Sequence, residues 1–108
     1  MNLIAARDPA LPSGTLLGFR PEHFLPRDHF AVGESLQTFP FAVRRVEYLG
    51  SDRYVYGTVA DGVGDAATVI AKLPATVGTT IPEGETLEFA APRRALRYFD
   101  ATTGARRP

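Results

Sequence analysis

Residues 53–60 read Arg-Tyr-Val-Tyr-Gly-Thr-Val-Ala, and this stretch decides the fold class. Its residues separate by alternate position, with Tyr54, Tyr56 and Thr58 on one side and Val55, Gly57 and Val59 on the other. A repeat of two is typical of a β-strand that buries one face. We therefore expect a strand here, with its valines turned toward the core.

A second strand is predicted just before the first, over residues 41–49. Its alternation is interrupted by Arg44 and Arg45, which stand between Val43 and Val46. One extra residue in a strand changes which side chains face the core, so a β-bulge at the two arginines would restore the pattern. The Gly-Ser-Asp sequence at 50–52 supplies a tight turn between the two strands.

The rest of the chain falls into short runs separated by glycine, proline and aspartate. Further strands are predicted over 15–20, 67–73, 85–90 and 95–99, turns over 61–65 and 82–84, a helical turn at 92–94, and a long loop with at most a short edge strand over 26–40. Short strands with a turn about every 8 to 12 residues favour a sandwich or small barrel. We predict an all-β fold: a small antiparallel barrel of five to six short strands, like the oligonucleotide/oligosaccharide-binding (OB) fold, whose closure would leave no free edge.

The chain has 108 residues, which fits one domain. Residues 1–14 contain Pro9, Pro12 and Gly14 without periodicity, so we predict a linker there and the folded domain over 15–108. Twelve basic and twelve acidic residues give a net charge of 0, which provides no long-range attraction to nucleic acid or anionic lipid. The absence of cysteine excludes disulfides, thiolate metal sites and cysteine nucleophiles.

No motif predicts a catalytic site or a bound cofactor. A phosphate-binding loop ends in Lys-Ser or Lys-Thr, but the only lysine, Lys72, lies between Ala71 and Leu73 in a predicted strand. Residues 62–67 superficially match a dinucleotide fingerprint, yet a β-branched run follows them where that motif requires a helix. We interpret those residues as an ordinary hairpin turn.

The two histidines, His23 and His29, are candidates for a metal or acid–base site. Zinc needs further ligands at defined spacing, and the chain has no cysteine and no third histidine. Glu22 beside His23 is a possible acid–base pair, but no nucleophile is organised with them. We therefore predict no metal site, and a turn histidine that makes a backbone hydrogen bond.

The alternative function is a stand-alone OB-fold module that binds nucleic acid or a small ligand. Basic and aromatic side chains that could stack on bases lie close in sequence: Arg44, Arg45, Arg53, Tyr48, Tyr54 and Tyr56. Acidic residues are interspersed among them, and tyrosine is also common in half-buried strands. We expect no nucleic-acid partner.

Four motifs, in order along the chain, resemble a known family. They are the Gly-Phe-Arg-Pro-Glu-His segment at 18–23, Val-Glu-Tyr-Leu-Gly at 46–50, Gly-Glu-Thr-Leu at 84–87, and Phe-Asp-Ala-Thr-Thr-Gly-Ala-Arg at 99–106. Together they resemble the C-terminal TOBE domain in the ATP-binding subunits of maltose- and glycerol-3-phosphate-type ABC importers. The Met-Asn-Leu start resembles a segment just after the ATPase domain, whereas residues 61–77 match no motif of the family.

The resemblance implies a regulatory and dimer-contact domain of a bacterial carbohydrate or glycerol-3-phosphate importer. ATP and Mg²⁺ would be bound by an ATPase domain that is not in this chain, so this part would not be an enzyme. The implied partners are that ATPase domain, a second copy of the subunit, the permease subunits indirectly and a regulatory protein. The implied location is the cytoplasmic face of the membrane, held there through the transporter.

Within the motifs we single out a corner at Arg20, Pro21, Glu22 and His23, which is either a structural turn or a regulatory or interface site. Pro21 fixes its own φ and extends the residue before it, which makes the corner rigid. Arg20 is then placed to donate in a fork to Glu22 or Asp100. The other motif residues are expected to be structural: Gly18, Glu47, Leu49, Gly50, Gly84, Glu85, Phe99, Asp100 and Gly104.

Overall fold

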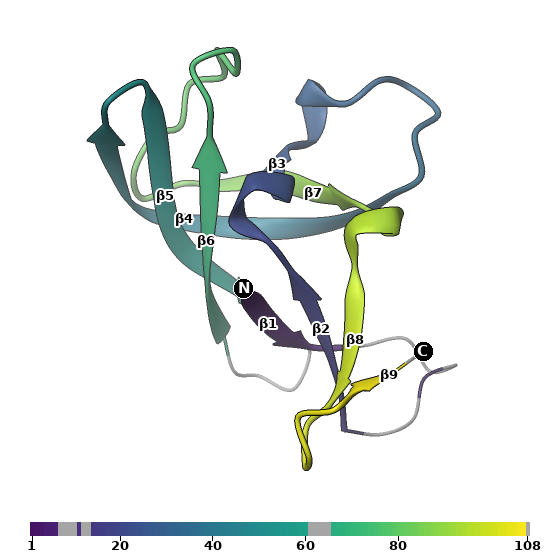
Figure 1. Cartoon of the computed structure of the whole chain (residues 1–108). Helices are drawn as coiled ribbons and strands as arrows, with labels where there is room; N and C mark the ends of the chain where they lie inside the picture. Colours follow the sequence, from purple (N-terminus) through teal and green to yellow (C-terminus); the bar gives the residue numbers. More distant parts are fainter. Residues whose placement is uncertain (7–10, 12–13, 61–65, 108) are drawn as a thin grey trace.

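The computed structural model describes residues 1–6, 11, 14–60 and 66–107 (Figure 1). In these ranges the chain forms nine β-strands and three short 3-10 turns, with no α-helix. One sheet has the order β1-β2-β8-β9, and the other has the order β3-β7-β4-β5-β6. The all-β, OB-like prediction is confirmed, but the described residues form nine strands in two antiparallel sheets that do not close into a barrel.

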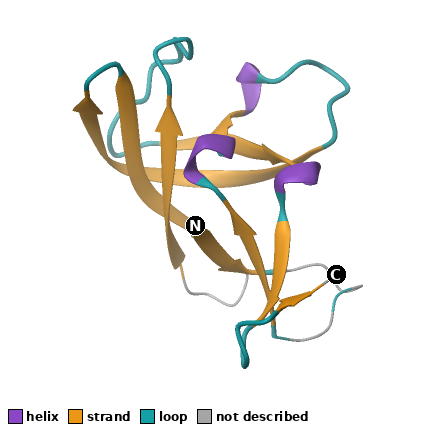
Figure 2. Cartoon of the chain, viewed as in Figure 1, coloured by secondary structure: helices purple, strands orange, loops and turns teal. Residues whose placement is uncertain are grey.

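The first sheet contains β1 (Asn2–Ala5), β2 (Thr15–Phe19), β8 (Arg97–Asp100) and β9 (Arg106–Arg107). The second contains β3 (Leu25–Pro26), β4 (Leu36–Leu49), β5 (Asp52–Ala60), β6 (Ala66–Leu73) and β7 (Thr86–Pro92). The 3-10 turns are η1 (Pro21–His23), η2 (Arg27–His29) and η3 (Arg93–Ala95), and they lie toward one end of the molecule (Figure 2). The helical turn predicted at 92–94 is therefore confirmed, one residue later.

The hairpin of β4 and β5 follows the predicted alternation. Val55 and Val59 are buried, whereas Tyr54, Tyr56 and Thr58 are half-buried on the opposite face. The register between the two strands shifts between Val43 and Arg45, so the predicted bulge is confirmed. On β6, Val69, Ala71 and Leu73 are all buried, as expected for one face. The turn predicted over 61–65 lies outside the described residues.

The loop predicted over 26–40 is too long, because β4 already begins at Leu36. The misleading residue is Pro40, which lacks an N–H and so argued against a central strand. Pro40 pairs with Glu88 of β7, but it lies one residue beyond the first pair of β4 with β5, which is Phe41 with Val59. At that position the missing N–H costs the sheet little, and the strand continues through the proline.

The predicted linker and the predicted last strand also differ from the structure. Residues 2–5 form β1, which pairs with β2 in the register of Asn2 with Phe19. The prediction of a final strand at 95–99 missed β9, which follows a turn and pairs Phe99 with Arg106. Both missed strands are short and lie in the smaller sheet, where little periodicity is available to reveal them.

One buried side chain joins the two sheets. Asn2 of β1 donates from Nδ2 to the carbonyl of Ile70 and accepts at Oδ1 from the Ile70 N–H, each at 2.8 Å. Asn2 is only 6% exposed. The Asn2 side chain thus pairs with both the N–H and the carbonyl of Ile70. Ile70 lies on β6, the edge strand of the second sheet. This contact spans 68 residues of sequence and holds β1 against β6.

The core lies between the sheets and is rich in phenylalanine. Fully enclosed rings are contributed by Phe19, Phe24, Phe41 and Phe89. Ring centroids of Phe41 and Phe89 are 4.9 Å apart, and those of Phe24 and Phe41 are 5.1 Å apart, within the range for favourable aromatic pairs.

No helix in the described part of the chain is long and apolar enough to span a membrane.

Candidate functional site

The corner at residues 20–23 has the predicted rigid geometry. Arg20 is extended, with φ −80° and ψ 149°, as the proline after it requires. Pro21 opens η1, and the N–H of His23 donates to the carbonyl of Arg20 at 3.0 Å. The turn ends at Phe24, whose N–H donates to the carbonyl of Pro21. The motif therefore encodes a single closed turn between β2 and β3.

Phe24 anchors this corner to the core. It is fully buried, and its ring lies within 5.9 Å, centroid to centroid, of Phe19, Phe39, Phe41 and Phe89. Because Phe24 is buried and packs against these rings, it holds the turn in place against the core. Phe24 was not among the residues predicted for the corner, although its place directly after the Pro-Glu-His turn is a usable signal.

The prediction that the Arg20 guanidinium donates two hydrogen bonds to the carboxylate of Glu22 or Asp100 is wrong. Arg20 and Glu22 are both exposed and do not form an ion pair in the described structure. Asp100 pairs with Thr15 at the start of β2, whereas Arg20 follows the end of that strand, so the two lie about 17 Å apart along it. That distance is too long for any side-chain fork. Asp100 instead accepts at Oδ1 from the N–H groups of Thr102 and Thr103, at 2.8 and 3.1 Å.

A shallow hollow opens beside the corner. Its volume is about 320 Å³. Its lining comes from η1, β3, η2 and the loop after it, the end of β7 and η3: Glu22, His23, Leu25, His29, Phe30, Glu34, Pro92 and Arg94. Glu22 and His23 belong to the predicted corner, and His29 is the other histidine of the candidate pair. The other five residues were missed, because they converge from segments up to 70 residues apart.

The histidines differ from their prediction. The buried Nδ1 of His23 has no hydrogen-bond partner, so the backbone bond expected for it is absent at that atom. His29 is exposed and meets Phe30 edge to face, with the ring centroids 5.3 Å apart. Among the described residues, no group of three or more histidine, aspartate or glutamate side chains is arranged to hold a metal ion.

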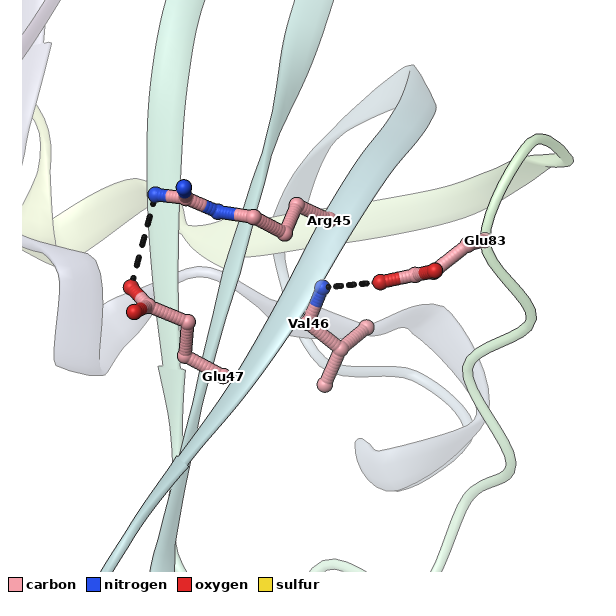
Figure 3. A network of polar contacts seen from close by, with 4 residues as sticks. All are labelled: Arg45, Val46, Glu47 and Glu83. Carbon is pink, nitrogen blue, oxygen red and sulfur yellow. Dashed lines mark hydrogen bonds and ion pairs between the residues drawn. The ribbon is translucent and has the colours of Figure 1, made fainter.

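Arg45, Tyr54 and Tyr56 of the nucleic-acid alternative contact neighbouring side chains, whereas Arg44 and Tyr48 are exposed. The Arg45 guanidinium lies 4.5 Å from the ring centroid of Tyr56, and its Nη2 is 3.4 Å from Oε1 of Glu47 (Figure 3). The Lys72 ammonium lies 5.9 Å from the ring centroid of Tyr54. A base stacking on these rings would have to displace the cations that already cover them.

Arg53 is likewise committed to the fold. Its Nη1 and Nη2 donate to the carbonyls of Thr79 and Val77, at 2.7 and 2.6 Å. Charged donors to carbonyls are among the stronger hydrogen bonds in proteins. Arg53 therefore fastens the segment between β6 and β7 to β5, rather than standing free for a phosphate.

Glu47 is the main influence on the pKa of Tyr56. A hydrogen bond from the phenol to Glu47 raises the pKa of Tyr56 above its ordinary value of 10.0, helped by desolvation and by the charge of Glu47 and opposed by Arg45. Because the folded pKa is raised, the stability that this bond contributes is complete below pH 10 and is lost as the pH rises through the folded value.

We expect Glu47→Gln to lower the Tyr56 pKa, because it removes both the charge and the anionic acceptor. The pH dependence of the NMR shifts of the phenol ring measures the change. Glu88→Gln, an exposed carboxylate on β7, is the matched control and should leave the titration as it was. An unchanged Tyr56 pKa in Glu47→Gln would contradict the assignment.

The remaining motif residues build turns and close contacts. Positive φ angles of 65°, 87° and 75° occur at Gly50, Gly84 and Gly104. The Gly84 N–H donates to the carbonyl of Val43, and the carbonyl of Glu85 accepts from the Val43 N–H, so this turn continues the β4–β7 ladder as far as the bulge. Leu49 is exposed at the tip of the β4–β5 hairpin.

Gly18 is required by close packing in the first sheet. A Cβ at Gly18 would lie 2.7 Å from the Phe99 ring and 2.8 Å from the Met1 sulfur. These contacts are shorter than real Cβ atoms tolerate, so a side chain here would displace the Phe99 ring and the Met1 side chain. The first and last family motifs thus meet across β2 and β8.

The chain matches no protein-family model. It is 35% identical over 91 residues to the sn-glycerol-3-phosphate import ATP-binding protein UgpC of Cereibacter sphaeroides, 40% identical over 91 residues to that of Burkholderia pseudomallei, and 36% identical over 104 residues to that of Chromobacterium violaceum. These matches cover 84%, 84% and 95% of this chain.

The chain spans only 23%, 22% and 25% of the length of those three relatives. The matched part is their C-terminal region, where a TOBE-type domain is expected, and the all-β, OB-like fold agrees with such a domain. The chain is therefore a homologue of the C-terminal region of glycerol-3-phosphate-type importer ATP-binding proteins, the family that its four motifs resemble.

Proposed function

We propose that the chain is the C-terminal regulatory and dimer-contact domain of the ATP-binding subunit of an ABC importer, with sn-glycerol-3-phosphate or a carbohydrate as cargo. The observation that carries the proposal is the match over 84–95% of this chain to import ATP-binding proteins of which it spans only about a quarter. The four motifs add support, since the corner, the turns and the close packing at Gly18 each depend on them.

On this proposal the chemistry belongs to the rest of the subunit. ATP and Mg²⁺ would bind to an ATPase domain, and this domain would hold no cofactor and catalyse nothing itself. Its own contribution would be protein contacts: with the ATPase domain, with a second copy of the subunit, through them with the permease, and with a regulatory protein. The subunit would work at the cytoplasmic face of the membrane. The coding sequence upstream of Met1 is the most direct check, because an in-frame Walker A loop and signature motif are expected there.

The corner supplies a mutational test in the full-length subunit. We expect Arg20→Ala or Glu22→Ala to weaken dimerisation or alter regulation while leaving nucleotide affinity within about twofold, because both side chains are exposed and unpaired with each other. Dimerisation by sedimentation and nucleotide binding by calorimetry should be measured side by side. Arg44→Ala and Glu88→Ala change exposed residues elsewhere and serve as matched controls. A loss of nucleotide affinity with intact dimerisation would show that the corner serves the ATP site instead.

A further inference from the structure

The hollow beside the corner combines an apolar floor with a charged rim. Leu25 and Pro92 are buried and Phe30 is half-buried, whereas Glu22, Glu34 and Arg94 are exposed. A volume of about 320 Å³ is at the lower end for small-molecule sites. The hollow is therefore large enough for one long side chain or a small solute.

The charged side chains on this rim are not paired with any of the residues that the structure describes. In the described structure, the side chains of Glu22, Glu34 and Arg94 make no ion pair and no hydrogen bond, although the Arg94 carbonyl accepts from Arg97. Two unpaired carboxylates against one guanidinium give the rim an excess of negative charge. An incoming cation would gain attraction here without breaking any existing contact.

The His23 imidazole adds a second unsatisfied group. Its buried Nδ1 has no hydrogen-bond partner, and such atoms in folded proteins call for an explanation. Because nothing anchors the ring through that nitrogen, a flip of the imidazole would cost no hydrogen bond there. The ring is thus able to present a nitrogen acceptor to a donor that enters the hollow.

We propose that this hollow receives an arginine or lysine side chain from a partner protein. The proposal rests on the proposed regulatory function and specifies which type of side chain the partner would present. The aliphatic stem would cover Leu25, Phe30 and Pro92, and the charged end would lie between Glu22 and Glu34. Long basic side chains bury their stems in this way while the charge stays in water. Arg94 opposes the incoming charge, so it limits the affinity.

Because Arg94 is positively charged, the direction in which its replacement changes the binding affinity distinguishes a bound cation from a bound anion. A bound cation predicts that Arg94→Ala strengthens binding, whereas a bound anion would need Arg94 and would be lost with it. A single side chain buries little area, so we expect dissociation constants of about 1–10 mM for a short peptide.

The experiment is an amide NMR titration of the 108-residue chain with acetylated, amidated Gly-Arg-Gly, with Gly-Gln-Gly as the neutral control and inorganic phosphate as the anionic control. We expect the arginine peptide alone to shift residues 22–34 and 92–95. The double variant Glu22→Gln/Glu34→Gln should weaken binding about tenfold, Glu88→Gln should not change it, and Arg94→Ala should tighten it severalfold.

Three results would overturn the proposal: equal shifts with the glutamine peptide, no shift at about ten times the expected dissociation constant, or phosphate binding that Arg94→Ala abolishes. The last would assign the hollow to an anionic solute. These outcomes are independent of the proposed function, which stands or falls on the upstream coding sequence and on dimerisation of the full-length subunit.

Discussion

Replacing Phe24 by alanine is expected to lower the free energy of unfolding by about 3–5 kcal/mol, the range for truncating a fully buried phenylalanine. Phe24 is 0% exposed, and its ring meets four other phenylalanines at the junction of the two sheets. Truncation would leave a cavity beneath η1 and remove the support of the corner. Urea denaturation followed by far-UV circular dichroism measures the loss.

Tyr48→Ala is the control for this change, because Tyr48 is an aromatic residue that is 73% exposed. We expect it to alter stability by no more than about 0.5 kcal/mol. If the alanine variant at 24 does not fold, Phe24→Leu keeps most of the volume and should cost less than alanine while remaining measurable. Equal stabilities of the Phe24 and Tyr48 variants would contradict the packing described for the corner.

Asn2→Ala is expected to reduce stability by about 2–4 kcal/mol, because it removes two hydrogen bonds and leaves the N–H and carbonyl of Ile70 unpaired in a partly buried place. Hydrogen exchange gives a local measurement: the Ile70 amide should lose protection selectively. Leu3→Ala, on the same strand but 46% exposed, is the matched control and should leave Ile70 protected. Full protection of Ile70 in Asn2→Ala would refute the role assigned to Asn2.

The sequence predicted the parts of the fold that rest on local patterns. The β4–β5 hairpin, its bulge and the face of β6 all follow from alternation within a single run, where side chains at every second position share an environment. The turn at Gly84 and the turn η3 follow from residues whose backbone preferences are local.

Features that depend on distant partners were beyond such patterns. The four residues of β1 are too few to show a period, and their pairing is fixed by β2 and by the contact of Asn2 with Ile70, 68 residues away. Pro40 was a misleading local signal, because only the end of the β5 pairing makes a proline acceptable there. The predicted barrel closure failed for the same reason: the pairing of strand edges is decided by the whole chain.

The candidate site was likewise predictable only where its geometry depends on neighbouring residues in the sequence. The rigid turn at Arg20–His23 was predictable, because proline restricts both itself and the residue before it. The absence of an Arg20–Asp100 interaction was not predictable, because the sequence does not indicate which end of β2 lies beside Asp100. The hollow depends on three short turns meeting in space, and Glu34 and Arg94 gave no local sign that they share it.

The contact between Glu83 and the bulged strand bears on solubility. Beyond Val43, β4 loses β7 as a neighbour, and the exposed N–H of Val46 is taken by Oε2 of Glu83 at 2.9 Å (Figure 3). A strand of another molecule that added here would have to expel this carboxylate or bury its charge. Proteins commonly protect open sheet edges with charged side chains in this way. We therefore expect Glu83 to hinder the addition of a strand from another molecule at the β4 edge, and with it aggregation.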